Sequence, residues 1–265
     1  MEPRTKDFKQ EAAKALADAT IQKNMQNLYG GFFKARERAA DETPGWEAMQ
    51  DRAREIKAHT IEHLDYYLDK ASRNVEKSGG TVFFATNAED ATRYVLDLAI
   101  SRGVKTIIKS KSMISEEMGL NEKLEEAGME PVETDLGEYL IQLRDETPYH
   151  IIAPAIHLSK DQVSDLLHEK LGGPRYDRAE DLTKLARDHL RNKFIEADMG
   201  ITGANFLVAD TGSLVLVTNE GNGRMCTSMP RIHVAIMGME KIVPALEDMG
   251  IFLRLLIRSA TGQRL

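Results

Sequence analysis

Cysteine is nearly absent from this chain of 265 residues, because Cys226 is the only one. A single cysteine excludes an intrachain disulfide, and within this chain it also excludes a cysteine-only iron–sulfur cluster or a cysteine-rich structural zinc site. No apolar run approaches the roughly 20 residues that a membrane-spanning helix needs. The polar amino terminus lacks the apolar core of a signal peptide. We therefore expect a cytoplasmic protein without a membrane span.

Basic residues are also fewer than acidic ones, with 35 Lys and Arg against 42 Asp and Glu. The formal net charge of −7 and the pI near 5.6 argue against a nucleic-acid partner. What is present, 42% hydrophobic and 29% charged residues, is typical of a globular protein. The length suffices for one large domain with an appendage, or for two modest domains.

The hydrophobic pattern divides the chain near residue 78. Residues 1–77 show only helical periodicity, so we expect a helical extension that ends in one long helix, from Trp46 to Glu76. From residue 78 to 265 strands alternate with helices, which predicts a three-layer α/β/α domain with a mostly parallel sheet. The predicted strands are 81–85, 105–109, 130–133, 150–153, 205–209, 213–218, 233–237 and 252–257, and the predicted helices are 88–101, 115–127, 137–143, 160–171, 179–197 and 241–248.

The stretch around residues 205–224 is the most informative part of the sequence. Two β-rich runs flank Asp210-Thr211-Gly212, which predicts a hairpin. The second run, Ser213–Thr218, has almost no polar alternation and is typical of a strand covered on both faces. Asn219-Glu220-Gly221-Asn222-Gly223-Arg224 follows it, at the end of a strand where open α/β sheets bind their ligands.

Glu220 is the candidate catalytic residue of this loop. A glutamate beside a glycine-rich loop is suited to act as an acyl-accepting nucleophile or as a general base. The alternative is a glutamate that only braces the loop by accepting N–H groups. Arg224 has two interpretations as well, because a guanidinium binds a substrate carboxylate bidentately or pairs with Glu220.

A basic loop, Lys109-Ser110-Lys111-Ser112, lies between a predicted strand and a helix that we expect Ser115 to cap. Two ammonium groups, two hydroxyls and a nearby helix amino terminus suit a phosphate or a carboxylate. The alternative is a solvated basic turn.

Three further positions have both a structural and a functional interpretation. Asp135 and Glu138 open a predicted helix, where they form a capping box or contact a ligand. His157 follows a predicted strand and is a satisfied structural residue or a ligand-binding one.

Metal and dinucleotide patterns are weak. His59, Glu62 and His63 match a metalloprotease spacing, but they lie in a charged helical segment that we interpret as a partly exposed helix face, so we expect no metal site. The glycines near residue 222 do not complete a dinucleotide fingerprint. Cys226 has no cysteine neighbour, and we expect a structural role for it.

Several of these motifs together resemble a known family. KSKSMISEEMGLN (109–121), ETDLGEYLIQL (133–143), PAIH (154–157), the run 197–225 and PRIHVAIMGMEKIVP (230–244) are similar to the lactate-utilization (LUD) domain, and within that family to the amino-terminal part of the iron–sulfur B subunits of L-lactate utilization complexes. The resemblance covers nearly the whole chain.

This resemblance implies a fold similar to ribose-phosphate isomerases and CoA transferases, and a role in oxidising L-lactate to pyruvate within a complex of several subunits. It also implies [4Fe–4S] clusters in a carboxy-terminal ferredoxin-like segment that this sequence lacks, so we expect the chain to be truncated and to bind no cofactor itself. By analogy with the superfamily, the loop at Glu220 is similar to the glutamate loop of CoA transferases.

Three functions follow as hypotheses: the substrate-side domain of a lactate-oxidising complex, an acyl- or CoA-handling enzyme that uses Glu220, and a scaffold that docks redox partners through the helical extension. The first hypothesis predicts a small carboxylate ligand and partner subunits. The candidate substrate-binding residues are Lys109, Ser110, Ser112, Asp135, Glu138, His157, Asn205, Asp210, Thr211, Asn219, Asn222 and Arg224. We expect the dispersed groups among them to meet where the strands of the sheet end.

Overall fold

The computed structural model describes residues 5–149 and 153–263. The chain forms two compact units, each built from separate segments of the sequence. Unit 1 contains the described residues of 1–21, 84–203 and 217–237, and unit 2 contains those of 22–83, 204–216 and 238–265. The predicted boundary at residue 78 therefore lies within unit 2, and the division into 1–77 and 78–265 stays a prediction.

Unit 1 is built around a parallel sheet, called the large sheet below. Its strand order is β2-β1-β3-β6, and every neighbouring pair is parallel. Lys109 at the end of β1 is in register with Glu133 on one side and Ile201 on the other. The predicted parallel sheet is thus confirmed. Its strands are β1 (Thr106–Lys109), β2 (Glu130–Glu133), β3 (Met199–Thr202) and β6 (Ile232–Ala235).

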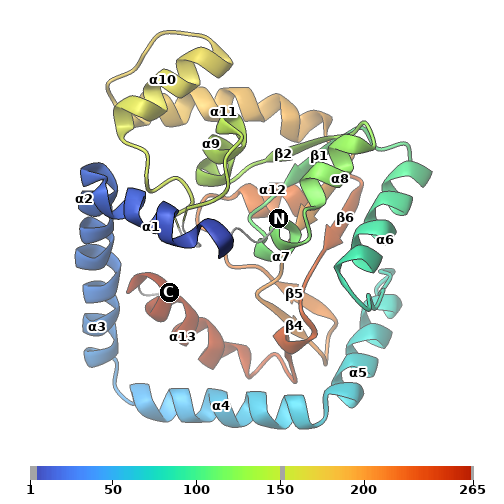
Figure 1. The fold of residues 1–265 in the computed structure, drawn as a ribbon. Coiled ribbons are helices and arrows are strands. Elements are labelled where there is room, and N and C mark those ends of the chain that lie inside the picture. The colour runs from blue at the N-terminus through green and yellow to red at the C-terminus, as the bar shows by residue number, and fades with distance from the viewer. Residues whose placement is uncertain (1–4, 150–152, 264–265) are drawn as a thin grey trace. The chain divides into compact units, whose positions relative to one another are not determined.

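Helices cover both faces of the large sheet, as Figure 1 shows. On one face, Val95 of α6 and Leu124 of α8 pack with Ile107 of β1. On the other, Leu190 of α11 packs with Ile108 of β1. Adjacent strand residues point to opposite faces, so Ile107 and Ile108 belong to different cores, which confirms the three-layer α/β/α class. The covering helices are α6 (Ala88–Ser101), α8 (Leu120–Glu126), α9 (Leu136–Arg144), α11 (Ala179–Glu196) and α12 (Asn222–Ser228).

Helix α12 lies unusually close to the large sheet. A Cβ added to Gly200 in β3 would lie 1.9 Å from the carbonyl oxygen of Cys226. Only glycine permits this backbone approach. The thiol side chain of Cys226 is fully buried and belongs to the core between the sheet and α11.

Unit 2 contains a smaller sheet of order β5-β4-β7, called the small sheet below. The predicted hairpin is confirmed, because β4 and β5 pair antiparallel with Phe206 opposite Val215. Ile56 of α4, Val208 of β4 and Phe252 of α13 form its core. Tyr67 and Ala71 of α5 (Leu64–Lys77) pack with Ile242 in a second core. The elements of the first core are α4 (Trp46–Glu62), β4 (Phe206–Val208), β5 (Ser213–Val215), β7 (Ile242–Val243) and α13 (Met249–Thr261).

The remaining elements are helical. Residues 5–77 are helical nearly throughout, as predicted, although the helix expected from Trp46 to Glu76 is broken at His63 into α4 and α5. No helix among the described residues is both long and apolar enough to cross a membrane. These elements are η1 (Thr5–Asp7), α1 (Phe8–Ala17), α2 (Ala19–Leu28), η2 (Tyr29–Phe33), α3 (Lys34–Asp41), α7 (Met113–Glu117), α10 (Lys160–Leu171) and η3 (Met239–Lys241).

Three predictions about the ends of the α/β region are wrong. Residues 81–85 form no strand, and Phe83 and Phe84 there are exposed. The predicted helix 241–248 instead contains the last residue of η3, then β7 and a turn, and the predicted strand 252–257 lies within α13. In α13 the buried Met249 and Phe252 are three residues apart, which is the spacing of one helix face.

Two predictions within the α/β region also need correction. The helix expected at 115–127 is split into α7 and α8, and its first cap is Ser112 rather than Ser115. The run 213–218 is not covered on both faces, because β5 is an edge strand whose Leu214 is exposed. The strand expected at 150–153 falls on 150–152, outside the described residues, and Ala153 is in no strand.

Candidate functional site

Polar side chains gather at the carboxyl ends of β1 and β2 in the large sheet. The Nζ atom of Lys109 lies 2.6 Å from Oε1 of Glu133 and 2.6 Å from Oδ1 of Asn121 in α8. The amide of Asn121 also donates to Glu133, at 2.9 Å. Lys109 is 1% exposed, so this ion pair is closed to water. Two ions are stable at such depth only when each is paired and hydrogen-bonded, as they are here.

The loop after β1 begins α7 directly. The hydroxyl of Ser112 accepts a hydrogen bond from the backbone N–H of Ser115, so Ser112 is the amino-terminal cap of α7. The backbone of Ser110 donates to Ile201 of β3 at 3.0 Å. Gly203, just past the end of β3, lies against the Ser112 side chain. Ser110 and Ser112 are both buried, which rules out the solvated turn as a description of the two serines.

Lys111 reaches from this loop to Glu138 in α9, with 2.8 Å between Nζ and Oε1. Glu138 is therefore not the capping-box partner of Asp135. Its side chain is only 2% exposed, whereas that of Lys111 is 28% exposed. Burial raises the pKa of the Glu138 carboxyl, and Lys111 opposes that shift.

Glu116 of α7 completes the group. The carboxylates of Glu138 and Glu133 place negative charge near its carboxyl. Desolvation, followed by these two like charges, raises the pKa of Glu116 to about 7. We call Lys109, Lys111, Glu116, Glu133 and Glu138 the edge cluster.

The amino terminus of α9 receives two carboxylates. Asp135 caps the helix, because its Oδ1 accepts the N–H of Gly137 at 3.2 Å. Glu220 accepts the N–H of Leu136, also at 3.2 Å. Although Glu220 is exposed, partial desolvation and then the charge of Asp135 raise its pKa. This contact matches a bracing role, and catalysis by Glu220 stays a prediction.

The residues around Glu220 differ in burial. Asn222 is buried and lies between Thr218, whose hydroxyl donates to it at 3.3 Å, and Thr134, to which its amide donates at 3.5 Å. Asn219 and Arg224 are exposed. The structure thus brings Lys109, Ser110, Ser112, Asp135, Glu138, Glu220 and Asn222 to one edge of the large sheet.

His157 belongs to a different part of unit 1. Its Nε2 lies 3.0 Å from Oε2 of Glu146, and its ring lies against that of Tyr149, with 5.2 Å between centroids. Arg144 and His157 together hold the pKa of Glu146 below its usual range, with Arg144 first.

Three candidates lie in unit 2. Asp210 forms an ion pair with Lys70, Thr211 donates to the hydroxyl of Ser213 in the hairpin turn, and the backbone of Asn205 donates to Val215. These contacts support the hairpin. A ligand role for the three residues stays a prediction, as does the role of each other candidate.

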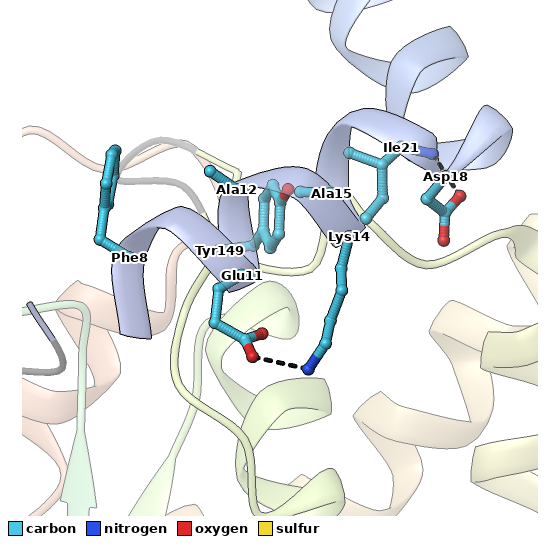
Figure 2. A pocket seen from close by; sticks show the side chains of 8 residues that line it. All are labelled: Phe8, Glu11, Ala12, Lys14, Ala15, Asp18, Ile21 and Tyr149. Carbon is cyan, nitrogen blue, oxygen red and sulfur yellow. Dashed lines mark hydrogen bonds and ion pairs between the residues drawn. The ribbon is translucent and has the colours of Figure 1, made fainter. Parts of the chain in front are cut away.

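One shallow pocket of unit 1 lies apart from the edge cluster, and Figure 2 shows its lining. Apolar groups of α1 and the Tyr149 ring form most of it, and its charged pair, Glu11 with Lys14, is exposed. None of the predicted site residues lines it. The lining residues are Phe8, Glu11, Ala12, Lys14, Ala15, Asp18, Ile21 and Tyr149.

Asn121, Glu116 and Glu133 were absent from the predicted site. Glu116 follows Ser115 in the sequence and resembles a helix-dipole residue. The available signal was Glu133, a charged residue ending the run Pro131-Val132 that is otherwise apolar and buried. A charge inside a buried strand requires a partner.

The comparison with known families decides what kind of chain this is. The family model of the LUD domain matches residues 68–265. The chain belongs to the LUD domain family. This LUD domain is similar to "Lactate utilization protein B" of Bacillus cytotoxicus, with 45% identity over 98% of the chain and 55% of the relative. It is 46% identical to the protein of the same name from Bacillus licheniformis, over 98% of the chain and 55% of the relative.

A third relative is the "Uncharacterized electron transport protein YkgF" of Escherichia coli, which is 43% identical over 98% of the chain and 54% of the relative. This LUD domain thus spans about half the length of the curated relatives it matches. No solved structure matches the chain.

Proposed function

We propose that this LUD domain takes part in lactate utilization as the part of a larger assembly that binds the small carboxylate substrate. The observation that carries the proposal is the similarity along 98% of the chain to proteins named for lactate utilization. The finer proposal is that the assembly oxidises L-lactate to pyruvate together with other subunits. That reaction removes two electrons and two protons from each lactate.

We propose that the iron–sulfur clusters of that reaction lie outside these residues. The sole cysteine, Cys226, is fully buried, and burial raises the pKa of its thiol to about 11, which disfavours the thiolate that a cluster needs. Among the described residues no group of three His, Cys, Asp or Glu side chains is placed to hold a metal ion. Iron–sulfur clusters that accept the electrons therefore require cysteines outside residues 1–265.

The carboxylate is proposed to bind at Lys111. The Lys111 side chain is 28% exposed and that of Lys109 is 1% exposed, although the Nζ atom of Lys111 is itself buried against Glu138. A charge-assisted hydrogen bond from an ammonium to a carboxylate contributes about 1.5–3 kcal/mol. Loss of Lys111 is therefore expected to weaken binding roughly 10- to 100-fold.

Calorimetric titration of the chain with L-lactate and with pyruvate tests this proposal. Lys111→Met should weaken binding of both acids by the factor above. Lys123→Met is the matched control, because Lys123 is an exposed lysine of the same unit that pairs with Glu126. Failure of the unaltered chain to bind either acid, or equal affinity in the two lysine variants, contradicts the proposal.

A further inference from the structure

A cluster of exposed aromatic rings lies on unit 2, in the π-helical segment η2. The rings of Tyr29 and Phe33 stack with 4.8 Å between their centroids and are 59% and 41% exposed, and Phe32 is 38% exposed. Single apolar side chains are common on protein surfaces, whereas a contiguous apolar patch marks an interaction site. A π-helical turn is itself rare and is found frequently at functional sites.

Two glycines between these rings are not required by the described part of the chain. A Cβ added to Gly30 or Gly31 would meet no atom within 4 Å, and neither residue has a positive φ. Glycine inside a helix is unfavourable relative to alanine, so a pair of glycines without a packing reason is unexpected. A partner backbone that lies directly against η2 accounts for them, because glycine permits close backbone approach.

A helix from the other end of unit 2 packs beside the rings. Arg36 of α3 follows Phe32 by four residues and Phe33 by three, which is the spacing of one helix face. Helix α13 contacts both α3 and η2. Gly262 at its end lies so close to Ala35 that an added Cβ would overlap the backbone there.

The surroundings of the rings carry excess positive charge. Helices α3 and α13 contain two carboxylates, Glu37 and Asp41, against five cations. None of these cations forms an ion pair within the described chain: Lys34, Arg36, Arg38, Arg254 and Arg258. A positive surface on a chain of net charge −7 is complementary to an acidic partner.

The comparison with relatives indicates where such a partner is found. The LUD family model begins at residue 68, so η2 lies outside it. The Bacillus relatives nevertheless match 98% of this chain, and the chain spans only 55% of each of them. The helical segment before residue 68 is therefore shared with proteins that contain a further stretch of polypeptide.

We propose that an acidic segment of this further polypeptide docks on the η2 patch, which consists of Tyr29, Phe32, Phe33, Lys34 and Arg36. The rings contact its apolar side chains, the two glycines admit its backbone, and the cations pair with its carboxylates. Aromatic residues and arginine are enriched at protein interfaces. A lipid surface does not need a bare glycine backbone, and a second copy docked through the same patch would bring like charges together.

Hydrogen–deuterium exchange read by mass spectrometry compares this chain with the full-length Bacillus licheniformis relative. Backbone amides of the relative that match residues 28–36 should exchange at least about tenfold more slowly than those of this chain, after correction for intrinsic rates, because docking opposes local opening. Amides of α11, in the core of unit 1, should exchange alike in both proteins.

Substitutions in the relative locate the docking face. Serine at the two positions that match Tyr29 and Phe33 should abolish the protection, while unchanged exchange of α11 shows that the variant is folded. Serine at the position that matches Ile61, another exposed apolar residue of unit 2, is the matched control and should leave the protection intact. Raising NaCl from about 0.05 M to about 0.5 M should weaken the protection, since salt screens the charge pairs.

Equal exchange of the matching amides in the two proteins overturns the proposal, as does protection that survives the serine substitutions. Two measurements on this chain then show what else covers the patch. Analytical ultracentrifugation detects a second copy, and sedimentation with vesicles of equal parts phosphatidylglycerol and phosphatidylcholine detects a membrane surface. None of these experiments uses lactate or pyruvate, so their failure is distinct from failure of the proposed function.

Discussion

The large sheet and the small sheet both end their strands in charged residues, but only the large sheet buries them. Lys109 and Glu133 at the ends of β1 and β2 are 1% and 5% exposed and bind each other and Asn121. Asp210, after β4 of the small sheet, is exposed and pairs with Lys70 on α5. A buried ion pair costs desolvation that an exposed pair avoids. The edge of the large sheet is therefore built around buried charges, whereas the hairpin turn of the small sheet carries an exposed ion pair that only stabilises it.

The strongest test of this contrast is removal of one buried ion. Lys109→Met should lower the free energy of unfolding by about 3–5 kcal/mol, because Glu133 is left as an uncompensated buried charge. Urea denaturation followed by circular dichroism measures the effect. Lys70→Met is the matched control in the small sheet and should leave stability nearly unchanged.

A double variant sharpens this prediction. Lys109→Met combined with Glu133→Leu removes both ions and should recover most of the lost stability. Equal stability of Lys109→Met and Lys70→Met would show that the two edges do not differ as described.

Backbone packing gives the next largest effect. Gly200→Ala should destabilise the chain by about 3 kcal/mol, because its Cβ would lie 1.9 Å from the carbonyl oxygen of Cys226. Gly250→Ala at the start of α13 meets open space and should raise stability by up to about 0.5 kcal/mol. Both variants are compared in the same urea titration. A Gly200→Ala chain as stable as the unaltered one would contradict the close approach of α12.

The smallest expected effect concerns pH and stability. The pKa of Glu116 in the folded chain is raised to about 7, from an ordinary value near 4.5. A group with a raised folded pKa contributes stability below its unfolded pKa and loses it as the pH rises through its folded pKa. Glu116→Gln should therefore gain Tm relative to the unaltered chain between pH 5 and pH 8.

The gain should be about 2–4 °C, the shift that about 1 kcal/mol produces in a chain of this size, after allowance for the partial exposure of Glu116. Differential scanning fluorimetry across that pH range measures it. Glu117→Gln should show no such trend, and a constant Tm difference in Glu116→Gln would count against the raised pKa.

Much of the large sheet was predictable from the sequence because its signals are local. Strand β1, with Ile107 and Ile108, and the long amphipathic helix α11 follow from short-range patterns. Strand β5 was predicted as a strand, but its exposure was not, because position at the edge of a sheet depends on pairing with distant segments. The apolar run 252–257 lacks a distinguishing period over so few residues, and α13 differs from a strand only through its contacts.

The candidate site was predicted in outline for a similar reason. Lys109 and Asp135 follow strands, and parallel strands end at one edge, so their proximity was expected and is found. The partners were not predicted, since Asn121 and Glu133 lie 12 and 24 residues from Lys109. No short-range sequence pattern shows that Glu133 is the carboxylate that pairs with Lys109.

The close approach of α12 to the large sheet has one more consequence. Cys226, the only thiol, is fully enclosed on that helix. A thiol-reactive dye can reach it only when α12 separates from the sheet, so the rate of labelling reports local opening beside the loop that carries Glu220. A ligand that stabilises the packing of α12 on the large sheet should therefore lower the rate at which Cys226 is labelled.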